Sequence, residues 1–224
     1  MAYILNIETS TTNCSVALFN ELNLIDCIEE NTEDYSHSKS LHVFIDSILK
    51  KNKISPKELS AISVGKGPGS YTGLRIGVAS AKGLCYALEI PLIALETLEV
   101  LSQNVTEKGI AIPCLDARRM EVYSAVFDRK NSRIRDTKAE VLSEELFKNY
   151  LENDNVYFIG NANKKIKEII THKNANFIDD VYPSARQMGI LSYNKFKSKQ
   201  FENLNDFEPF YLKDFIAAKW NPNS

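Results

Sequence analysis

The sequence predicts an α/β protein made of two similar domains that face each other across a cleft. Over the first hundred or so residues, the apolar and turn patterns give the order of three strands, helix, strand, helix, strand, helix. A similar order begins again after Gly109, and both halves open on an apolar run that ends in an acid, Tyr3–Glu8 and Gly109–Asp116. A repeat of roughly a hundred residues is too long for a solenoid. We therefore expect an N-terminal domain over residues 1–105 and a C-terminal domain over residues 106–224.

In the first half, short apolar runs between turn residues predict strands, and one-faced apolar spacing predicts helices. The expected strands are 3–7, 14–19, 24–29, 61–64 and 91–95, and the expected helices are 38–51, about 70–88 and 96–104. The helix over 38–51 shows the clearest stripe, because its apolar residues follow the spacing i, i+3, i+4, i+7, i+8. These residues are Leu41, Phe44, Ile45, Ile48 and Leu49.

The second half repeats the pattern less clearly and ends in an aromatic tail. The expected strands are 109–116, 120–127, 133–138 and 156–159, and the expected helices are 143–151, 161–171 and 183–196. The tail from about residue 205 contains Phe207, Phe210 and Tyr211. Because these side chains are apolar and large, we expect the tail to pack back on the first domain.

Composition excludes several broad classes of protein. The chain has 224 residues, of which 44% are hydrophobic, enough for one large core or two small domains. Its net charge of −2 gives no broad positive field for nucleic acid, so a role with RNA would need a local patch or a partner. No basic segment precedes the first apolar run, and no run approaches the ~18 residues that span a bilayer. We expect a cytoplasmic protein whose four cysteines are buried free thiols.

The glycine-rich segment Gly65–Gly77 is the first candidate for a functional site. It holds five of the nine glycines of the chain and lies between a predicted strand and a predicted helix. Its spacing fits neither the Walker loop nor the dinucleotide-binding fingerprint. Small residues recur every four positions, a spacing that would form a groove along one side of a helix. These residues are Gly69, Gly73, Gly77 and Ala81, with Cys85 next in the series. Close helix packing or an interface is one interpretation, and anion binding at the helix start is the other.

The acids at the two predicted hairpins are the second candidate. Glu8, Thr9, Ser10 and Thr11 combine a carboxylate with hydroxyls in a tight turn, which could hold phosphate and Mg²⁺. Asp116 would be the matching acid across the cleft. An ordinary polar turn, and a solvated charge cluster around Asp116, are the alternatives for the two hairpins.

Catalytic arrangements of other kinds find no support in the sequence. His37 and His42 are five residues apart, so they would point to different faces of a helix, and His172 is distant in sequence. There is no His-x-x-x-His and no Gly-x-Ser-x-Gly. We therefore predict that the chain has no catalytic nucleophile activated by a neighbouring general base.

Four segments together resemble the bacterial TsaB (YeaZ) family. They are Ile7–Ser10, Gly67–Gly77, Leu115–Arg118 and Glu121–Tyr123. The likeness is specific over residues 1–128, loose over 129–205 and weak in the tail, where Lys213 stands at a position that is usually Arg in the family.

The resemblance implies the two-lobed, ribonuclease H-like fold of actin, sugar kinases and heat-shock chaperones. It also implies a role in forming N6-threonylcarbamoyladenosine beside the anticodon of tRNAs that read codons starting with A. In that system the catalytic subunit is the paralogue TsaD, which carries a His-x-x-x-His metal site just after the strand that corresponds to Pro91–Leu95. The matching stretch Ala94–Leu101 contains no histidine here. The resemblance thus points to a scaffold subunit with no catalytic residue and no metal site of its own.

The resemblance also implies partners. These are TsaD, the ATPase TsaE on the complex of the two paralogues, a second copy of the chain when TsaD is absent, and tRNA through the complex. ATP would be used by the complex, with no cofactor required by this subunit. The two predicted helices 38–51 and 70–88 would form the interface. The expected interface residues are Leu41, Phe44, Ile45, Ile48, Gly73, Leu74, Gly77, Val78, Ala81 and Cys85.

Two other functions are weighed against the scaffold. A weak nucleotide-binding or ATP-hydrolysing enzyme of the kinase-like fold would use Glu8–Thr11 with Asp116 across the cleft. A metallopeptidase would need a cluster of metal ligands and a general base, and the sequence offers no such cluster.

Overall fold

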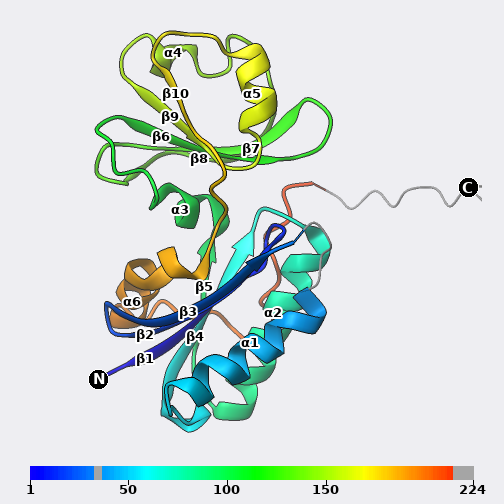
Figure 1. Cartoon of the computed structure of the whole chain (residues 1–224), viewed down its shortest axis with the longest axis vertical. Helices are drawn as coiled ribbons and strands as arrows, with labels where there is room; N and C mark the ends of the chain where they lie inside the picture. The colour runs from blue at the N-terminus through cyan, green and yellow to red at the C-terminus, as the bar shows by residue number, and fades with distance from the viewer. Residues whose placement is uncertain (33–36, 214–224) are drawn as a thin grey trace, which may run out of the picture.

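The protein has two lobes, each built on one five-stranded mixed sheet (Figure 1). A computed structural model describes residues 1–32 and 37–213. The strand orders are β3-β2-β1-β4-β5 in the first lobe and β10-β9-β6-β7-β8 in the second. The predicted α/β class with a repeated half is confirmed, since both lobes begin with an antiparallel hairpin whose first strand also pairs in parallel with a later strand.

The first lobe contains the first five strands and the two longest helices. Its elements are β1 (Tyr3–Glu8), β2 (Asn13–Asn20), β3 (Asn23–Asn31), α1 (His37–Lys51), η1 (Pro56–Glu58), β4 (Leu59–Gly67), α2 (Tyr71–Leu88), β5 (Leu92–Glu96) and α3 (Thr97–Ser102). Helices α1 and α2 cover one face of the sheet and α6 covers the other, while α3 lies between the lobes (Figure 1). Because both faces are covered, β1 and β5 are buried almost throughout.

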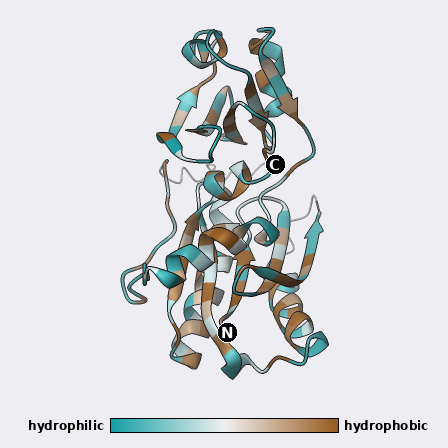
Figure 2. Ribbon diagram, turned by 90° about the vertical axis from the view of Figure 1, so that its left-hand side faces the viewer, coloured by the Kyte–Doolittle hydropathy of each residue, from teal (hydrophilic) through white to brown (hydrophobic). Residues whose placement is uncertain are grey.

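The second lobe is smaller and has shorter helices. Its elements are β6 (Ile110–Asp116), β7 (Glu121–Phe127), β8 (Arg133–Val141), α4 (Lys148–Leu151), β9 (Val156–Ile159), α5 (Asn163–Ile169) and β10 (Ala175–Ile178). A short 3-10 helix η2 (Ala185–Met188) and the helix α6 (Gly189–Lys197) follow. In both lobes the apolar segments lie mainly on the strands and on the helices that cover them (Figure 2).

Three details of the second half differ from the sequence predictions. The helix predicted over 143–151 is reduced to α4, and its N-cap residue, Phe147, provides no side-chain hydrogen bond. Strand β10 was not predicted because its four residues are only half-buried and include the polar Asn176. The helix predicted over 183–196 is divided into η2, capped by the Ser184 hydroxyl, and α6.

The last part of the second half belongs to the first lobe. Ala185 and Met188 lie in one buried cluster with Ile4 and Ile93 of the first sheet. The tail then continues along this lobe, where Phe207 packs against its core. The predicted division at residues 105 and 106 therefore differs from the structure after about residue 183, and its final part, 214–224, lies outside the described residues. Among those described, no helix is long and apolar enough to cross a membrane.

Candidate functional site

The first hairpin turn, which joins β1 to β2, is buried inside the first lobe. The Glu8 side chain has no exposed surface, and its Oε1 accepts a hydrogen bond from the Ser10 N–H at 2.7 Å. Its Oε2 has no hydrogen-bond partner within the described part of the chain. Burial raises the pKa of the Glu8 carboxyl, and the hydrogen bonds from Ser10 oppose that shift. The Glu8 carboxyl is therefore enclosed within the first lobe.

The glycines of the segment Gly65–Gly77 cover this turn. A Cβ at Gly73 would overlap the Thr9 carbonyl oxygen, and a Cβ at Gly77 would overlap the Thr9 hydroxyl. The same hydroxyl donates a hydrogen bond to the Gly73 carbonyl at 2.8 Å. The backbone of α2 therefore lies directly against the first turn, and the glycines are needed for this internal packing.

The structure places the predicted groove and the predicted interface residues inside the first lobe. Helix α2 begins at Tyr71 with Ser70 as its N-cap, so Gly69 precedes the helix and the prediction that it belongs to a helical groove is wrong. Phe44 is half-buried, and nine of the predicted interface residues are buried. The buried nine are Leu41, Ile45, Ile48, Gly73, Leu74, Gly77, Val78, Ala81 and Cys85.

The outer side of the same two helices is exposed and was not predicted in detail. Tyr86 is 82% exposed and Val43 is 58% exposed. Ala79 and Gly83 are also exposed, and a Cβ at Gly83 would meet no atom within 4 Å. We call the exposed set formed by Val43, Ala79, Gly83 and Tyr86 the helix face. Its signal in the sequence was weak, because small residues are common on both sides of α2.

The second hairpin turn, which joins β6 to β7, is on the surface. The exposed Asp116 carboxylate forms an ion pair with Lys165 at 2.6 Å and accepts the Arg118 N–H at 2.8 Å. Lys213 of the tail donates to the Ala117 carbonyl at 3.2 Å and pairs with Glu121 at 2.6 Å. Asp116 and Glu8 thus have separate partners, and the contacts found in residues 1–32 and 37–213 do not join them.

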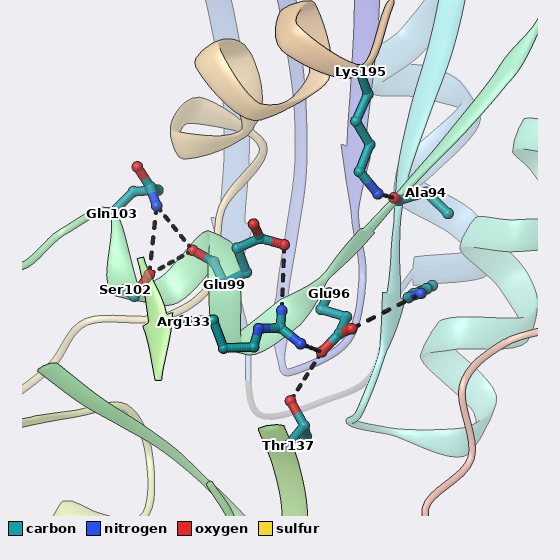
Figure 3. Close-up of polar contacts among 9 residues, drawn as sticks. Ala94, Glu96, Glu99, Ser102, Gln103, Arg133, Thr137 and Lys195 are labelled. Carbon is teal, nitrogen blue, oxygen red and sulfur yellow. Dashed lines mark hydrogen bonds and ion pairs between the residues drawn. The ribbon is translucent and has the colours of Figure 1, made fainter. Parts of the chain in front are cut away.

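A polar clamp connects the two lobes (Figure 3). Arg133 of β8 donates to Glu96 at 2.7 Å and to Glu99 at 3.4 Å. The Thr137 hydroxyl of the same strand donates to Glu96 at 2.9 Å. These carboxylates lie in the stretch where the paralogue is expected to carry its histidines, and here they bind a cation of the opposite lobe. Sequence reasoning missed this clamp because its partners are more than thirty residues apart.

The described cavities lie along the segment that returns to the first lobe. One has a volume of about 500 Å³ and includes Glu29 and Asp180 in its lining. The other, about 370 Å³, shares Asp180 and includes Lys164 and Lys167. Because Lys167 is paired with Asp179, the lining offers little uncompensated positive charge for a triphosphate. Within the described residues, no group of three or more His, Cys, Asp or Glu could hold a metal ion.

The cysteines have the properties of structural thiols. All four are free; Cys14, Cys85 and Cys114 are buried, and Cys27 is half-buried. Burial raises the pKa of Cys14 and of Cys85 to about 12. Because the thiolate is the reactive form, these two side chains are inert at neutral pH.

Two α/β lobes with the same strand order define a protein of the two-lobed class that includes actin and sugar kinases. A crystal structure of an uncharacterized Pseudomonas aeruginosa protein with similarity to peptidase YEAZ has the same fold, with a TM-score of 0.83. It covers 95% of this chain and 100% of its own, at 23% sequence identity, so the likeness concerns the fold.

Sequence comparisons identify the family. A family model described as "TsaD: tRNA N6-adenosine threonylcarbamoyltransferase" matches residues 31–219. The tRNA threonylcarbamoyladenosine biosynthesis protein TsaB of Bacillus subtilis is 34% identical, over 97% of both chains. TsaB of Haemophilus influenzae is 30% identical, over 98% of this chain and 97% of its own. The chain belongs to the TsaB family.

Proposed function

We propose that this chain is a non-catalytic subunit that binds and activates the catalytic paralogue TsaD in tRNA threonylcarbamoyladenosine biosynthesis. The biosynthetic process is the one named for its TsaB relatives. The observation that carries the proposal is the helix face, where a large aromatic ring and two small residues are exposed on α2 and a valine is exposed on α1. A surface of this kind is typical of the centre of a protein interface.

The helix face is suited to close approach by another helix. Gly83 has open space where a Cβ would stand, and Ala79 lies one turn before it on the same side of α2. Tyr86 can contribute a large contact area to such an interface, and tyrosine is frequent among residues that dominate binding. His42 and Ser80, whose side chains are 3.3 Å apart, connect α1 to α2 so that both helices present one surface. Without TsaD, the same face would serve a second copy of the chain.

The first turn supports the non-catalytic part of the proposal. Glu8 is fully buried and Thr9 is bonded to Gly73, so neither presents a polar group to a nucleotide. ATP use would then fall to the assembled complex, with TsaE as its ATPase, and tRNA would be modified on TsaD. This chain would require no cofactor of its own.

The test is co-elution with TsaD in size-exclusion chromatography. Ala79→Arg combined with Gly83→Arg places two large cations on the helix face without touching the core, so we expect the complex to be lost and the circular dichroism spectrum to be kept. Gln200→Arg, an exposed position after α6 on the opposite side of the sheet, is the control and should co-elute as the unaltered chain does. Co-elution of the double variant would refute the proposed interface. Substituting Gly77 and Ala81 instead would be uninformative, because both are buried in the first lobe.

A further inference from the structure

The second hairpin turn holds two arginines in a backbone conformation that does not favour them. Arg118 has φ of 66° and Arg119 has φ of 48°, so both are in the left-handed region. Asn and Gly are the residues that adopt this conformation at least cost. The turn geometry therefore gives no preference for arginine at either position.

The acids around the turn are already bound to lysines. Asp116 pairs with Lys165, and Glu121 pairs with Lys213. The Arg118 and Arg119 side chains are exposed, and neither guanidinium forms a hydrogen bond or an ion pair with the described residues. Two cations thus remain available on a short turn whose anionic groups are neutralised.

Helix α2 contributes a third arginine, Arg75, which the C-terminal tail contacts through Tyr211. The Arg75 guanidinium lies 4.1 Å from the Tyr71 ring centroid, and its Nε donates to the Tyr211 hydroxyl at 3.2 Å. The two tyrosine rings are 4.9 Å apart. These contacts hold Arg75 in place through its Nε atom and its guanidinium plane, and they leave its two terminal nitrogens available. Glu208 is the acid that interacts electrostatically with Arg75.

One short stretch of tail joins the two groups of residues. Tyr211 touches Arg75 on the first lobe, and Lys213 touches Ala117 on the second lobe. Two residues of chain span at most about 7 Å of backbone, so the tail links Arg75 of α2 to the second turn. Figure 1 shows the tail running beside α2 toward the second lobe. We call Arg75, Arg118, Arg119 and Tyr211 the arginine surface.

We propose that the arginine surface binds the phosphate backbone of RNA. The planar guanidinium group matches phosphate oxygens in pairs, and a partly exposed tyrosine beside it can stack on an unpaired base. The stacking ring favours RNA over an acidic segment of protein. The inference rests on the proposed function, since it assigns to this subunit a direct contact with the tRNA that the complex modifies. It also explains how a chain of net charge −2 could contact RNA through one local patch.

The experiment uses a pair of variants at the turn and a matched pair at the neighbouring hairpin. Arg118→Asn with Arg119→Gly removes two cations and gives the turn the residues its backbone prefers, so loss of folding does not confuse the result. Arg129→Gln with Lys130→Gln removes two cations from the turn between β7 and β8. Binding of an in vitro transcribed tRNA that reads an ANN codon is measured at several salt concentrations, both with the isolated chain and with its complex with TsaD.

Binding by the Arg118→Asn, Arg119→Gly chain should be roughly 14- to 30-fold weaker at 0.15 M salt, and the slope of log K against log salt should fall by about 1.4 to 1.8. The matched pair should change neither. Equal affinity and equal slope for the turn variant would overturn the inference. Loss of TsaD binding by that variant, with RNA binding kept, would also overturn it and assign the surface to a protein contact. Failure of the unaltered chain to bind TsaD would instead count against the proposed function, and the isolated chain would still test the RNA contact.

Discussion

The two hairpin turns occupy equivalent places in the two lobes but have opposite environments. The turn after β1 is buried, and glycines of α2 lie against it. The turn after β6 is exposed and is held by two lysines, one of them from the tail. Both follow the first strand of a sheet with the same topology, so the strand order alone does not determine which turn is open to a ligand.

The difference shows that one position of this fold can be buried in one lobe and exposed in the other. In the first lobe the Thr9 hydroxyl is bonded to Gly73 of α2, and the Glu8 carboxyl is bonded within its own turn. In the second lobe the backbone carries two left-handed arginines whose side chains point to no internal partner among the described residues. We therefore expect substitutions at the first turn to change the free energy of unfolding, and substitutions at the second turn to change binding.

The largest effect should come from filling the space between α2 and the first turn. Gly73→Ala would place a methyl group against the Thr9 carbonyl, so we expect a loss of roughly 3 kcal/mol or more in the free energy of unfolding. Gly83→Ala, on the same helix but in open space, should gain up to about 1 kcal/mol. Urea denaturation measures both. Similar values for the two variants would contradict the close packing.

The next largest effect should come from weakening the polar clamp between the two lobes. Arg133→Ala removes the interlobe cation of Glu96 and Glu99 and leaves the Thr137 hydroxyl as the interlobe partner of Glu96, so we expect a loss of roughly 2 kcal/mol. Arg129→Ala removes an ion pair with Asp154 within the second lobe. Because the Arg129 side chain is largely exposed, we expect the free energy of unfolding to fall by no more than about 1 kcal/mol. Thermal unfolding of both variants distinguishes them, and equal losses would argue against a clamp between lobes.

A smaller effect concerns the pH dependence of the buried turn. The pKa of Glu8 is raised in the folded chain, so the fold prefers the protonated carboxyl. Its contribution to stability is complete below the ordinary pKa of a glutamate, is lost as the pH rises through the raised pKa, and is constant above it. Glu8→Gln should flatten this decline in denaturation midpoints between acid and neutral pH. An unchanged profile would show that Glu8 is ionised at little cost.

The smallest effect should come from relaxing the exposed turn. Arg118→Asn with Arg119→Gly should stabilise the chain by about 1 kcal/mol, because both left-handed residues are replaced by ones that tolerate this conformation. The midpoint of urea unfolding reports the gain. A loss of stability would mean that the arginines support the fold, and it would weaken their assignment to binding.

The sequence predicted the order of strands and helices along the first half, including α1 and α2, from apolar runs and one-faced apolar spacing. It predicted the resemblance to the TsaB family from motifs that the comparisons confirm. It did not predict which side of α2 is buried, because Gly73, Gly77 and Ala81 have small neighbours on the outer side too. Nor could it predict the return of Ala185 to the first lobe or the bond from Arg133 to Glu96, since both join segments far apart in the chain.

The most direct test of the account is threonylcarbamoyl transfer to tRNA in a system reconstituted from this chain, TsaD and TsaE with ATP. We predict that transfer requires the chain, continues with Glu8→Gln, and is lost with Ala79→Arg combined with Gly83→Arg. The account would be contradicted by the reverse pattern, in which the Glu8→Gln chain still binds TsaD but transfer stops, while the helix-face variant remains active. That outcome would place chemistry at the first turn and remove the role proposed for the helix face.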